Sequence, residues 1–223
     1  MFISQIKLKM SDNTFFELSK MLRTKGYLVH QYLWNIFSKG PDDNRDFLYR
    51  QISSGKKLSF IAVSKEEPNR ESGIWDIETK SYCPLLKKDQ ILSFSVRANA
   101  IVSKKDEKGK QKRCDVVMDA KYHLRKIQNE LKLALTQDII NESGIKWLKA
   151  REEKNGFLLD EKKCFVYSYD QHRFFKQGSA PISFSTIDIK GVLSVTDLEK
   201  FTKLLFNGIG PCKGFGCGLM LIR

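Results

Sequence analysis

This chain is poor in the residues that build metal and redox sites. Its 223 residues include only three histidines and five cysteines. The cysteines are scattered, form no CxxC pair and are odd in number, which predicts reduced thiols in a cytoplasmic protein without zinc. Adjacent carboxylates at 42–43, 66–67 and 152–153 fit turns or solvated faces, and no DxD or HxD constellation indicates a two-metal nuclease. We therefore expect no cofactor.

Long apolar runs and acidic residues are also scarce. No stretch approaches the roughly 18 apolar residues of a membrane-spanning helix, and residues 1–9 alternate like a strand rather than a signal peptide. The chain has 39 Lys and Arg residues and 26 Asp and Glu residues, which gives a net charge of +13. Such an excess favours a polyanionic partner, either nucleic acid or an acidic membrane surface.

The first half of the chain has the order of a ferredoxin-like motif. Residues 27–37 predict a helix because Val29, Leu33, Ile36 and Phe37 form one apolar stripe. Residues 66–83 carry a weak helix signal. Strands are predicted at 2–9, 47–52, 58–63 and 91–98. The resulting order, β-α-β-β-(α)-β, is that of the motif.

The second half repeats the theme less regularly. Residues 101–102 extend the preceding strand into a basic segment, 104–113. The further elements predicted are helices at 119–137 and 139–154, a hairpin at 157–175, a strand at 182–195, a helix from Asp197 to Phe206, and a last strand at 219–222. We therefore expect an α+β protein of two tandem ferredoxin-like (RRM-like) domains, 1–95 and 96–223.

A glycine-rich segment precedes the last strand. Five of residues 208–218 are glycine, and Lys213 lies among them. Backbone N–H groups of Gly210, Gly214 and Gly216 could approach phosphate oxygens closely. A tight connection between helix and strand is the alternative. The segment is neither a P-loop nor a dinucleotide fingerprint, because a strand follows it where those motifs need a helix.

His30 is the strongest candidate for acid–base chemistry. It lies on the helix at 27–37, at the edge of the apolar stripe, and Tyr27 is one turn before it on the same face. An imidazole can act as general base or acid near neutral pH. A packing or capping histidine is the alternative. His123 and His172 lie among basic residues, where phosphate contact or solvation explains them better than catalysis.

Four segments together resemble the CasE family, the repeat-processing endoribonucleases of type I-E CRISPR Cascade complexes. They are residues 2–6, residues 28–37 with 41–50, residues 94–100 with 112–114, and residues 208–218. Their order and spacing cover most of the chain. Two features depart from the family: residues inserted between the first strand and the His30 helix, and the unmatched sequence of 66–83.

The resemblance implies two ferredoxin-like domains and metal-free cleavage of precursor CRISPR RNA at the 3′ base of each repeat hairpin. His30 and Tyr27 match the family's catalytic histidine and tyrosine. The 2′-OH would attack the adjacent phosphate, leaving 5′-OH and 2′,3′-cyclic phosphate ends. The protein would stay bound to the hairpin of the mature guide RNA as a Cascade subunit. The alternative is a subunit that binds the hairpin without cutting it.

Several basic residues are predicted to bind the RNA. Stem affinity should come mainly from phosphate contacts and shape, because side chains do not readily enter the deep major groove of A-form RNA. Lys213 would contact phosphate near the glycine-rich segment. Arg97 faces either RNA or an interdomain ion pair, and a solvated charge run is the alternative for residues 104–113. The remaining candidates are Lys112, Arg113, Lys162, Lys163, Arg173 and Lys176. The strands lack the RRM aromatic signature, which argues against generic single-strand binding.

Overall fold

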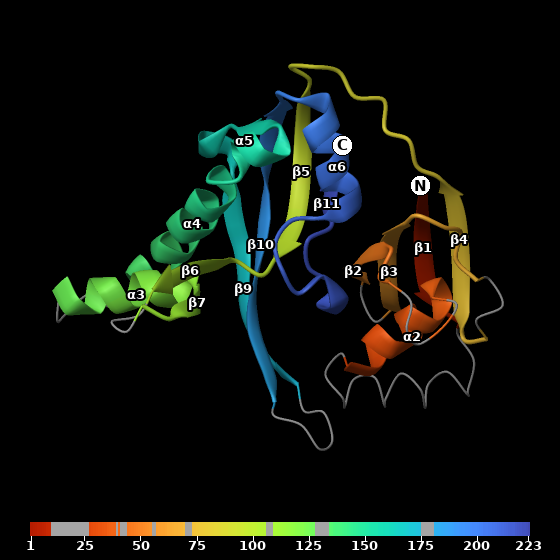
Figure 1. Cartoon of the computed structure of the whole chain (residues 1–223), viewed down its shortest axis with the longest axis horizontal. Coiled ribbons are helices and arrows are strands. Elements are labelled where there is room, and N and C mark those ends of the chain that lie inside the picture. Colours follow the sequence, from red (N-terminus) through yellow and green to blue (C-terminus); the bar gives the residue numbers. More distant parts are fainter. Residues whose placement is uncertain are drawn as a thin grey trace.

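The computed structural model describes residues 1–9, 27–38, 40, 44–54, 57–69, 73–105, 109–127, 134–174 and 181–223. The Tyr27 side chain and all of Lys176 lie outside the described residues. The described part forms a four-stranded sheet, a five-stranded sheet and a two-stranded hairpin. Figure 1 shows the two larger sheets side by side, with the hairpin beyond the second. None of the described helices is long and apolar enough to span a membrane.

The N-terminal unit is built on the antiparallel sheet β2-β3-β1-β4. Its strands are β1 (Phe2–Leu8), β2 (Phe47–Ser54), β3 (Lys57–Ser64) and β4 (Trp75–Ser81). Helix α2 (Tyr27–Phe37) buries its predicted stripe, Val29, Leu33 and Ile36, in a core with Ile6, Phe60 and Trp75. Burying one such aliphatic side chain contributes about 1.5–3 kcal/mol. The stripe therefore holds one face of α2 against the sheet, and the opposite face is turned away from it.

The fourth strand of this sheet falls where a weak helix was predicted. Within residues 66–83, β4 alternates with period two, because Trp75 and Ile77 turn inward while Asp76 and Glu78 are exposed. Between β3 and β4 the structure describes residues 65–69 and 73–74, and none of these is helical. The helix prediction for this segment is therefore wrong in the described residues.

The C-terminal unit is built on the sheet β11-β5-β10-β8, with β9 also paired to β10. Its strands are β5 (Ile91–Ala98), β8 (Phe157–Leu159), β9 (Phe165–Phe174), β10 (Ile182–Val195) and β11 (Met220–Ile222). The predicted hairpin at 157–175 is wrong in its pairing. A 3₁₀ turn, η1 (Glu161–Lys163), separates β8 from β9, and both pair with β10.

Strand β5 was predicted correctly as a strand but assigned to the wrong unit. It pairs with β10 and β11, so it opens the C-terminal sheet instead of completing the N-terminal one. We number the strands of each unit from one in chain order and count β8 and β9 as a single strand position. Both sheets then have the strand order 2-3-1-4. The predicted α+β class with tandem ferredoxin-like units is confirmed. We propose that the boundary lies in residues 82–90 rather than at 95, which falls inside β5.

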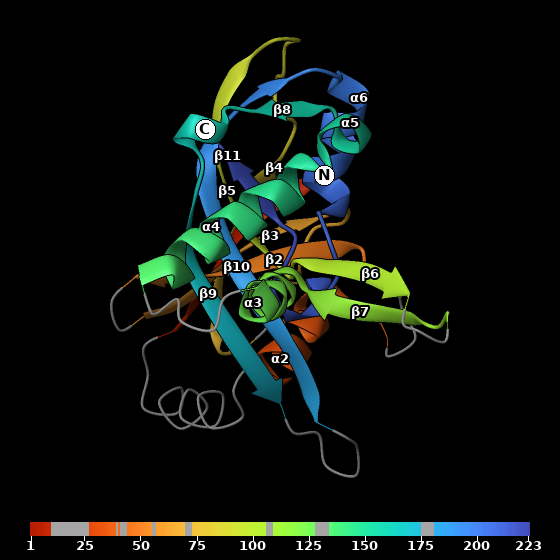
Figure 2. The same ribbon diagram turned by 90° about the vertical axis from the view of Figure 1, so that its left-hand side faces the viewer.

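Helices cover one face of the second sheet (Figure 2). They are α4 (Ala134–Lys149), α5 (Glu152–Asn155) and α6 (Leu198–Asn207), while α3 (Val116–Ile127) packs beside α4 and extends away from the sheet (Figure 1). Side chains of α4 and α6, such as Leu148 and Phe201, share a core with Val96 and Ile189 of the sheet. Of the predicted helix at 119–137, the structure describes residues 119–127 as part of α3 and residues 134–137 as part of α4. The predicted cap is confirmed, since the Asp197 carboxylate accepts the Lys200 N–H at 3.0 Å.

The basic segment after β5 forms a separate hairpin. Strands β6 (Ile101–Lys105) and β7 (Gln111–Asp115) pair only with each other in the described structure. Residues 101–102 therefore begin a new strand and do not lengthen β5. The hairpin projects from the C-terminal unit (Figure 2).

Candidate functional site

His30 lies where the two units meet. Its ring centroid is 5.8 Å from that of Phe215, in the glycine-rich loop, and 6.0 Å from that of Trp34 on its own helix. The ring is half-buried, as its place at the edge of the stripe predicted. The Nδ1 atom is buried without a hydrogen-bond partner among the described residues. The structure thus joins the two most distant parts of the predicted site.

The surroundings of His30 favour the neutral ring. Burial lowers the pKa of His30, and the positive charge of Arg45 lowers it further, while the backbone of Gly214 acts in the opposite direction. A neutral imidazole has one ring nitrogen free to accept a proton. The geometry therefore suits His30 to take up a proton near neutral pH.

The glycines of the loop are needed mainly for its own conformation. Gly208, Gly210, Gly216 and Gly218 have positive φ, and Cys212 also lies in the left-handed region at φ 58°. A Cβ at Gly218 would lie 2.8 Å from the Ile209 carbonyl oxygen. The loop contains one 3₁₀ turn, η2 (Lys213–Phe215), so it is also the tight helix-to-strand connection that the sequence left open.

The predicted phosphate donors differ in their availability. The Gly216 N–H donates to the Lys213 carbonyl at 3.3 Å, so this donor is used within the loop. The predicted roles of the Gly210 and Gly214 N–H groups stay predictions. A Cβ at Gly214 would lie 2.6 Å from Nη2 of Arg45, so a side chain there would displace the guanidinium from its present position.

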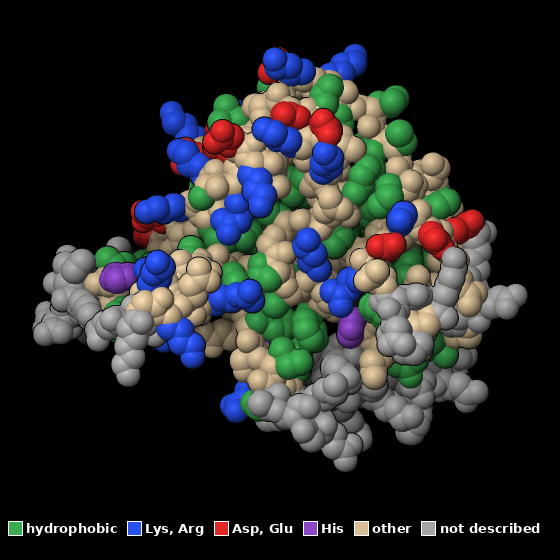
Figure 3. All heavy atoms as spheres, in the orientation of Figure 1, with side chains coloured by type: hydrophobic (Ala, Val, Ile, Leu, Met, Phe, Trp, Pro, Cys, Tyr) green, Lys and Arg blue, Asp and Glu red, His purple; other side chains and the backbone are tan. Residues whose placement is uncertain are grey.

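Two cations lie near the junction of α2 and the glycine-rich loop. Arg45, just before β2, reaches Gly214 and stands 6.0 Å from the centroid of the Trp34 ring. Burial lowers the pKa of Lys213, and the charge of Arg45 adds to this effect. Lys213 was predicted from sequence, whereas Arg45 was not singled out. Figure 3 shows Lys and Arg side chains over the middle of this face, with acidic side chains toward its edges.

Tyr49 anchors the loop from the N-terminal unit. Its buried hydroxyl donates to the Gly214 carbonyl at 2.8 Å, and burial raises the pKa of Tyr49, so the phenol stays protonated. The sequence analysis did not single out Tyr49. Its partner, 165 residues away, carried no signal in the sequence.

Phe215 connects His30 to the β9–β10 ribbon. Its ring stacks on Phe174 at 5.4 Å and lies 5.2 Å from Phe184. His172 stacks on Phe184 at 5.0 Å and lies 2.9 Å from the Thr186 hydroxyl, which gives His172 a packing role. Aromatic contacts thus hold the loop between α2 and the ribbon.

The other predicted RNA-binding residues are spread over the C-terminal unit. Lys112 and Arg113 are exposed on β7, and the charge of Arg113 offsets part of the rise that burial causes in the pKa of Cys212. This places Arg113 near the glycine-rich loop. Lys162 and Lys163 are exposed on η1, where Lys163 pairs with Asp160 at 3.0 Å, and Arg173 is exposed on β9. Their contacts with RNA stay predictions.

Arg97 forms an ion pair, although not the interdomain pair that was predicted as the alternative to RNA contact. Its Nε and Nη2 donate to Asp188 at 2.9 and 2.7 Å, and this bond raises the pKa of Arg97. Both residues belong to the C-terminal sheet, so the pair is not itself interdomain. Arg50 of β2 makes the interdomain contact, donating to Ser95 at 2.6 Å and lying 3.5 Å from Asp188. The sequence analysis did not identify Arg50 or Asp188.

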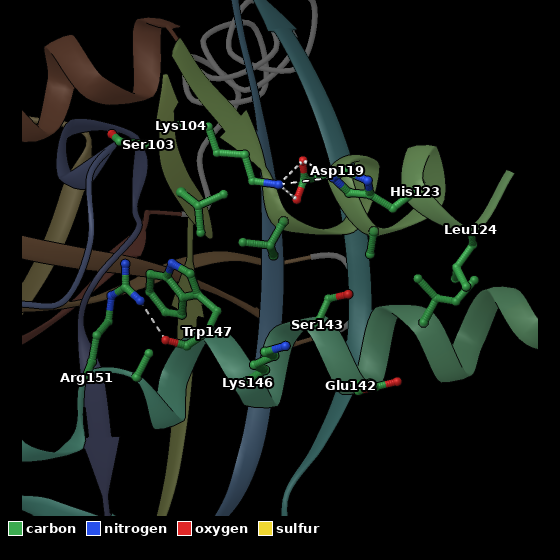
Figure 4. Close-up of a pocket in the computed structure, with 15 residues that line it drawn as sticks. Ser103, Lys104, Asp119, His123, Leu124, Glu142, Ser143, Lys146, Trp147 and Arg151 are labelled. Carbon is green, nitrogen blue, oxygen red and sulfur yellow. Dashed lines mark hydrogen bonds and ion pairs between the residues drawn. The ribbon is translucent and has the colours of Figure 1, made fainter. Parts of the chain in front are cut away.

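A separate hollow of about 610 Å³ lies between α3, α4 and the β6–β7 hairpin (Figure 4). Lys104 donates to Asp119 at 2.6 and 2.7 Å, and His123 stands beside this pair. Arg151 packs 3.9 Å over the ring of Trp147. Because the charges here compensate one another, the hollow suits a polyanion less well than the surroundings of His30 do. Within the described residues no three His, Cys, Asp or Glu side chains gather as a metal site would require.

The fold and the His30 site define a protein of two ferredoxin-like units with a basic loop between them. A model of the CRISPR associated protein family matches residues 1–223, and the chain belongs to that family. It is 27% identical over 196 residues to the CRISPR system Cascade subunit CasE of Escherichia coli K12, covering 87% of this chain and 89% of that protein. The resemblance to CasE predicted from sequence is confirmed.

Two solved structures share the fold. Thermus thermophilus Cse3, bound to an RNA representing a pre-cleavage complex, superposes with a TM-score of 0.72 and 21% identity over the whole of both chains. Cas6e of Escherichia coli K-12 gives a TM-score of 0.66 and 23% identity, over 100% of this chain and 99% of that one.

Proposed function

We propose that this chain is a CRISPR-repeat endoribonuclease that cuts precursor CRISPR RNA at the 3′ base of the repeat hairpin. The observation that carries the proposal is the position of His30 against the glycine-rich loop that contains Lys213, with Arg45 close enough to affect the pKa of both residues. This arrangement combines a proton acceptor with cations for a phosphate. Its relatives bear the names of a Cascade subunit and of an RNA-bound Cse3, which agrees with the proposal.

The chemistry we propose is an internal transfer that needs no metal ion. His30 takes the proton of the 2′-OH, and the 2′-oxygen attacks the adjacent phosphorus. The bond from phosphorus to the 5′-oxygen then breaks, and that oxygen takes a proton from water. Lys213 and Arg45 offset the negative charge of the phosphorane. Tyr27 keeps its predicted assisting role. The products are a 5′-OH end and a 2′,3′-cyclic phosphate.

After cleavage the protein stays on the hairpin of the guide RNA as a Cascade subunit in the cytoplasm. The net charge of +13 and the exposed Lys112, Arg113 and Arg173 support binding to the phosphates of the stem. Affinity for the hairpin should therefore fall steeply as salt concentration rises, and a flat response would count against these surfaces.

The test is single-turnover cleavage of the repeat hairpin from the protein's own genome. His30→Ala should lose cleavage while still binding the hairpin, and His123→Ala, an exposed histidine outside the site, should cut at the wild-type rate. A His30→Ala variant that cuts normally would remove His30 from the mechanism. Wild-type protein that binds the hairpin and never cuts it would establish the alternative, a non-catalytic RNA-binding subunit.

Two further measurements test the proposed cleavage mechanism independently of whether the protein is a nuclease. A 2′-deoxy nucleotide at the cut position should abolish cleavage and spare binding, because the attacking group is missing. EDTA should leave the rate unchanged. Loss of activity in EDTA that added Mg²⁺ restores would overturn the metal-free route but not the assignment as a nuclease.

A further inference from the structure

The helix-free face of the C-terminal sheet carries a second basic cleft, separate from His30. It has a volume of about 800 Å³ and lies where β2 meets β5, β9, β10 and β11. Five basic residues and one acidic residue line it: Arg50, Arg97, Lys163, Lys190, Arg223 and Asp188. Because Asp188 is already shared by two arginines, the cleft keeps a positive excess that fits an anionic ligand.

Two aromatic side chains are exposed in this cleft. Phe165 is 51% and Tyr167 is 42% exposed, with ring centroids 6.5 Å apart. The register of β9 against β10 shifts here, because Ser168 pairs with Asp188 and Val166 with Ile189, which leaves Tyr167 as the extra residue of a bulge. Phe165 and Tyr167 are two positions apart, so the alternation of the strand places both side chains on one face, opposite the buried Val166.

The aromatic rings are held in place by their neighbours. Arg50 donates from Nη2 to the Tyr167 hydroxyl at 2.7 Å, and the Lys190 ammonium lies 4.5 Å from the centroid of the Tyr167 ring. Phe165 is the cross-strand partner of Lys190, so ring and charge are adjacent on the surface. A ligand would meet a platform whose groups are already positioned, which lowers the ordering cost of binding.

We propose that this face binds single-stranded RNA, with bases stacked on Phe165 and Tyr167 and phosphates near Lys190, Lys163 and Arg97. Aromatic rings beside a positively charged groove are the features with which proteins bind single strands without sequence preference. The inference rests on the proposed function only in taking RNA as the ligand. The platform differs from the expectation drawn from the strands, because Phe165 and Tyr167 match no RRM signature.

The test is fluorescence anisotropy of the full chain with a short fluorescein-labelled oligouridylate. Phe165→Ala should weaken binding about tenfold, since one stacked base contributes on the order of 1–3 kcal/mol. Leu198→Ala, which removes an exposed apolar side chain from α6 of the same unit, should bind like the wild type. Lys190→Glu should also weaken binding, and Lys203→Glu on α6 is its matched control.

The outcomes are distinct from those of the cleavage test. His30→Ala should bind oligouridylate normally, and Phe165→Ala should cut at the wild-type rate a hairpin whose only flanking nucleotide is the one 3′ of the cut. Equal affinity of Phe165→Ala and wild type for oligouridylate would overturn the proposal, as would the absence of measurable binding, which is expected if a protein partner occupies this face. Loss of hairpin cleavage in His30→Ala says nothing about the platform.

Discussion

Tyr49 and Arg50 are neighbours on β2, and their side chains leave the strand on opposite faces to hold two different parts of the C-terminal unit. The Tyr49 hydroxyl bonds the Gly214 carbonyl of the glycine-rich loop at 2.8 Å. The Arg50 guanidinium bonds Ser95 and Tyr167 at 2.6 and 2.7 Å. The alternation of a single strand therefore connects the His30 site on one face with the aromatic cleft on the other.

The loop anchor can be tested by Tyr49→Phe. The substitution keeps the ring and leaves the buried Gly214 carbonyl without the hydroxyl, which should cost about 1–3 kcal/mol of unfolding free energy. Cleavage should also slow, because the loop carries Lys213. Urea unfolding and single-turnover kinetics measure the two effects. Tyr82→Phe, at a half-buried ring packed on Phe206, is the control. Unchanged stability in Tyr49→Phe would show that the hydrogen bond is not an anchor.

The buried charge cluster should be sensitive to loss of its carboxylate. Asp188→Asn leaves Arg50, whose side chain is 8% exposed, and Arg97 without a counter-charge. Breaking a buried pair in this way costs about 3–5 kcal/mol. The expected result is a lower urea midpoint with an unchanged slope. Asp160→Asn removes an exposed partner of Lys163 and should change stability little. Equal effects of the two substitutions would contradict the structural role of Asp188.

The pH profile of cleavage should depend on Arg45. A positive charge beside His30 disfavours the imidazolium, so Arg45→Ala should raise the pKa of His30. If His30 accepts the proton, the rate rises with pH as the ring becomes neutral, and this limb should move to higher pH in Arg45→Ala. NMR titration of the ring gives the same pKa without catalysis. Lys154→Ala removes a charge far from the site and should leave both measurements unchanged, whereas a shift to lower pH in Arg45→Ala would refute the assignment.

The glycine-rich loop should not tolerate a side chain at Gly218. Its φ is +94° and a Cβ would lie 2.8 Å from the backbone oxygen of Ile209. Gly109 has φ +76° with nothing within 4 Å of a Cβ, so Gly109→Ala tests positive φ alone. We expect Gly218→Ala to lower the unfolding free energy by at least about 1 kcal/mol more than Gly109→Ala. Equal costs would mean that the loop relaxes around the methyl group.

Local sequence patterns predicted a helix or strand well where that element buries an apolar stripe of its own residues. The helix at 27–37 and the Asp197 cap depend on residues a few positions apart, so their signals lie within one window. Strand β5 was found for the same reason. Its sheet was not, because pairing with β10 depends on residues about 90 positions away, such as Asp188 opposite Arg97.

The site was predicted in part for a similar reason. His30 and Lys213 stand in segments with recognisable composition. Arg45 and Tyr49 act through the loop at Gly214, and Arg50 acts through Ser95 and Asp188, contacts that no local pattern contains. Buried polar pairs between the units can be recognised only in the folded structure, because their two residues are far apart in the sequence.

Strand β10 sets the distance between the glycine-rich loop beside His30 and the aromatic cleft. Phe184, next to the loop of His30, and Lys190, in the aromatic cleft, lie on the same face of this strand, six positions apart. At about 3.3 Å per residue they stand roughly 20 Å from each other. Both positions belong to one continuous strand paired with β5 and β9, so the hydrogen bonds of the sheet hold this separation. An RNA that engages both places must bridge that interval, so the strand would set the spacing between a bound single-stranded segment and the point of cleavage.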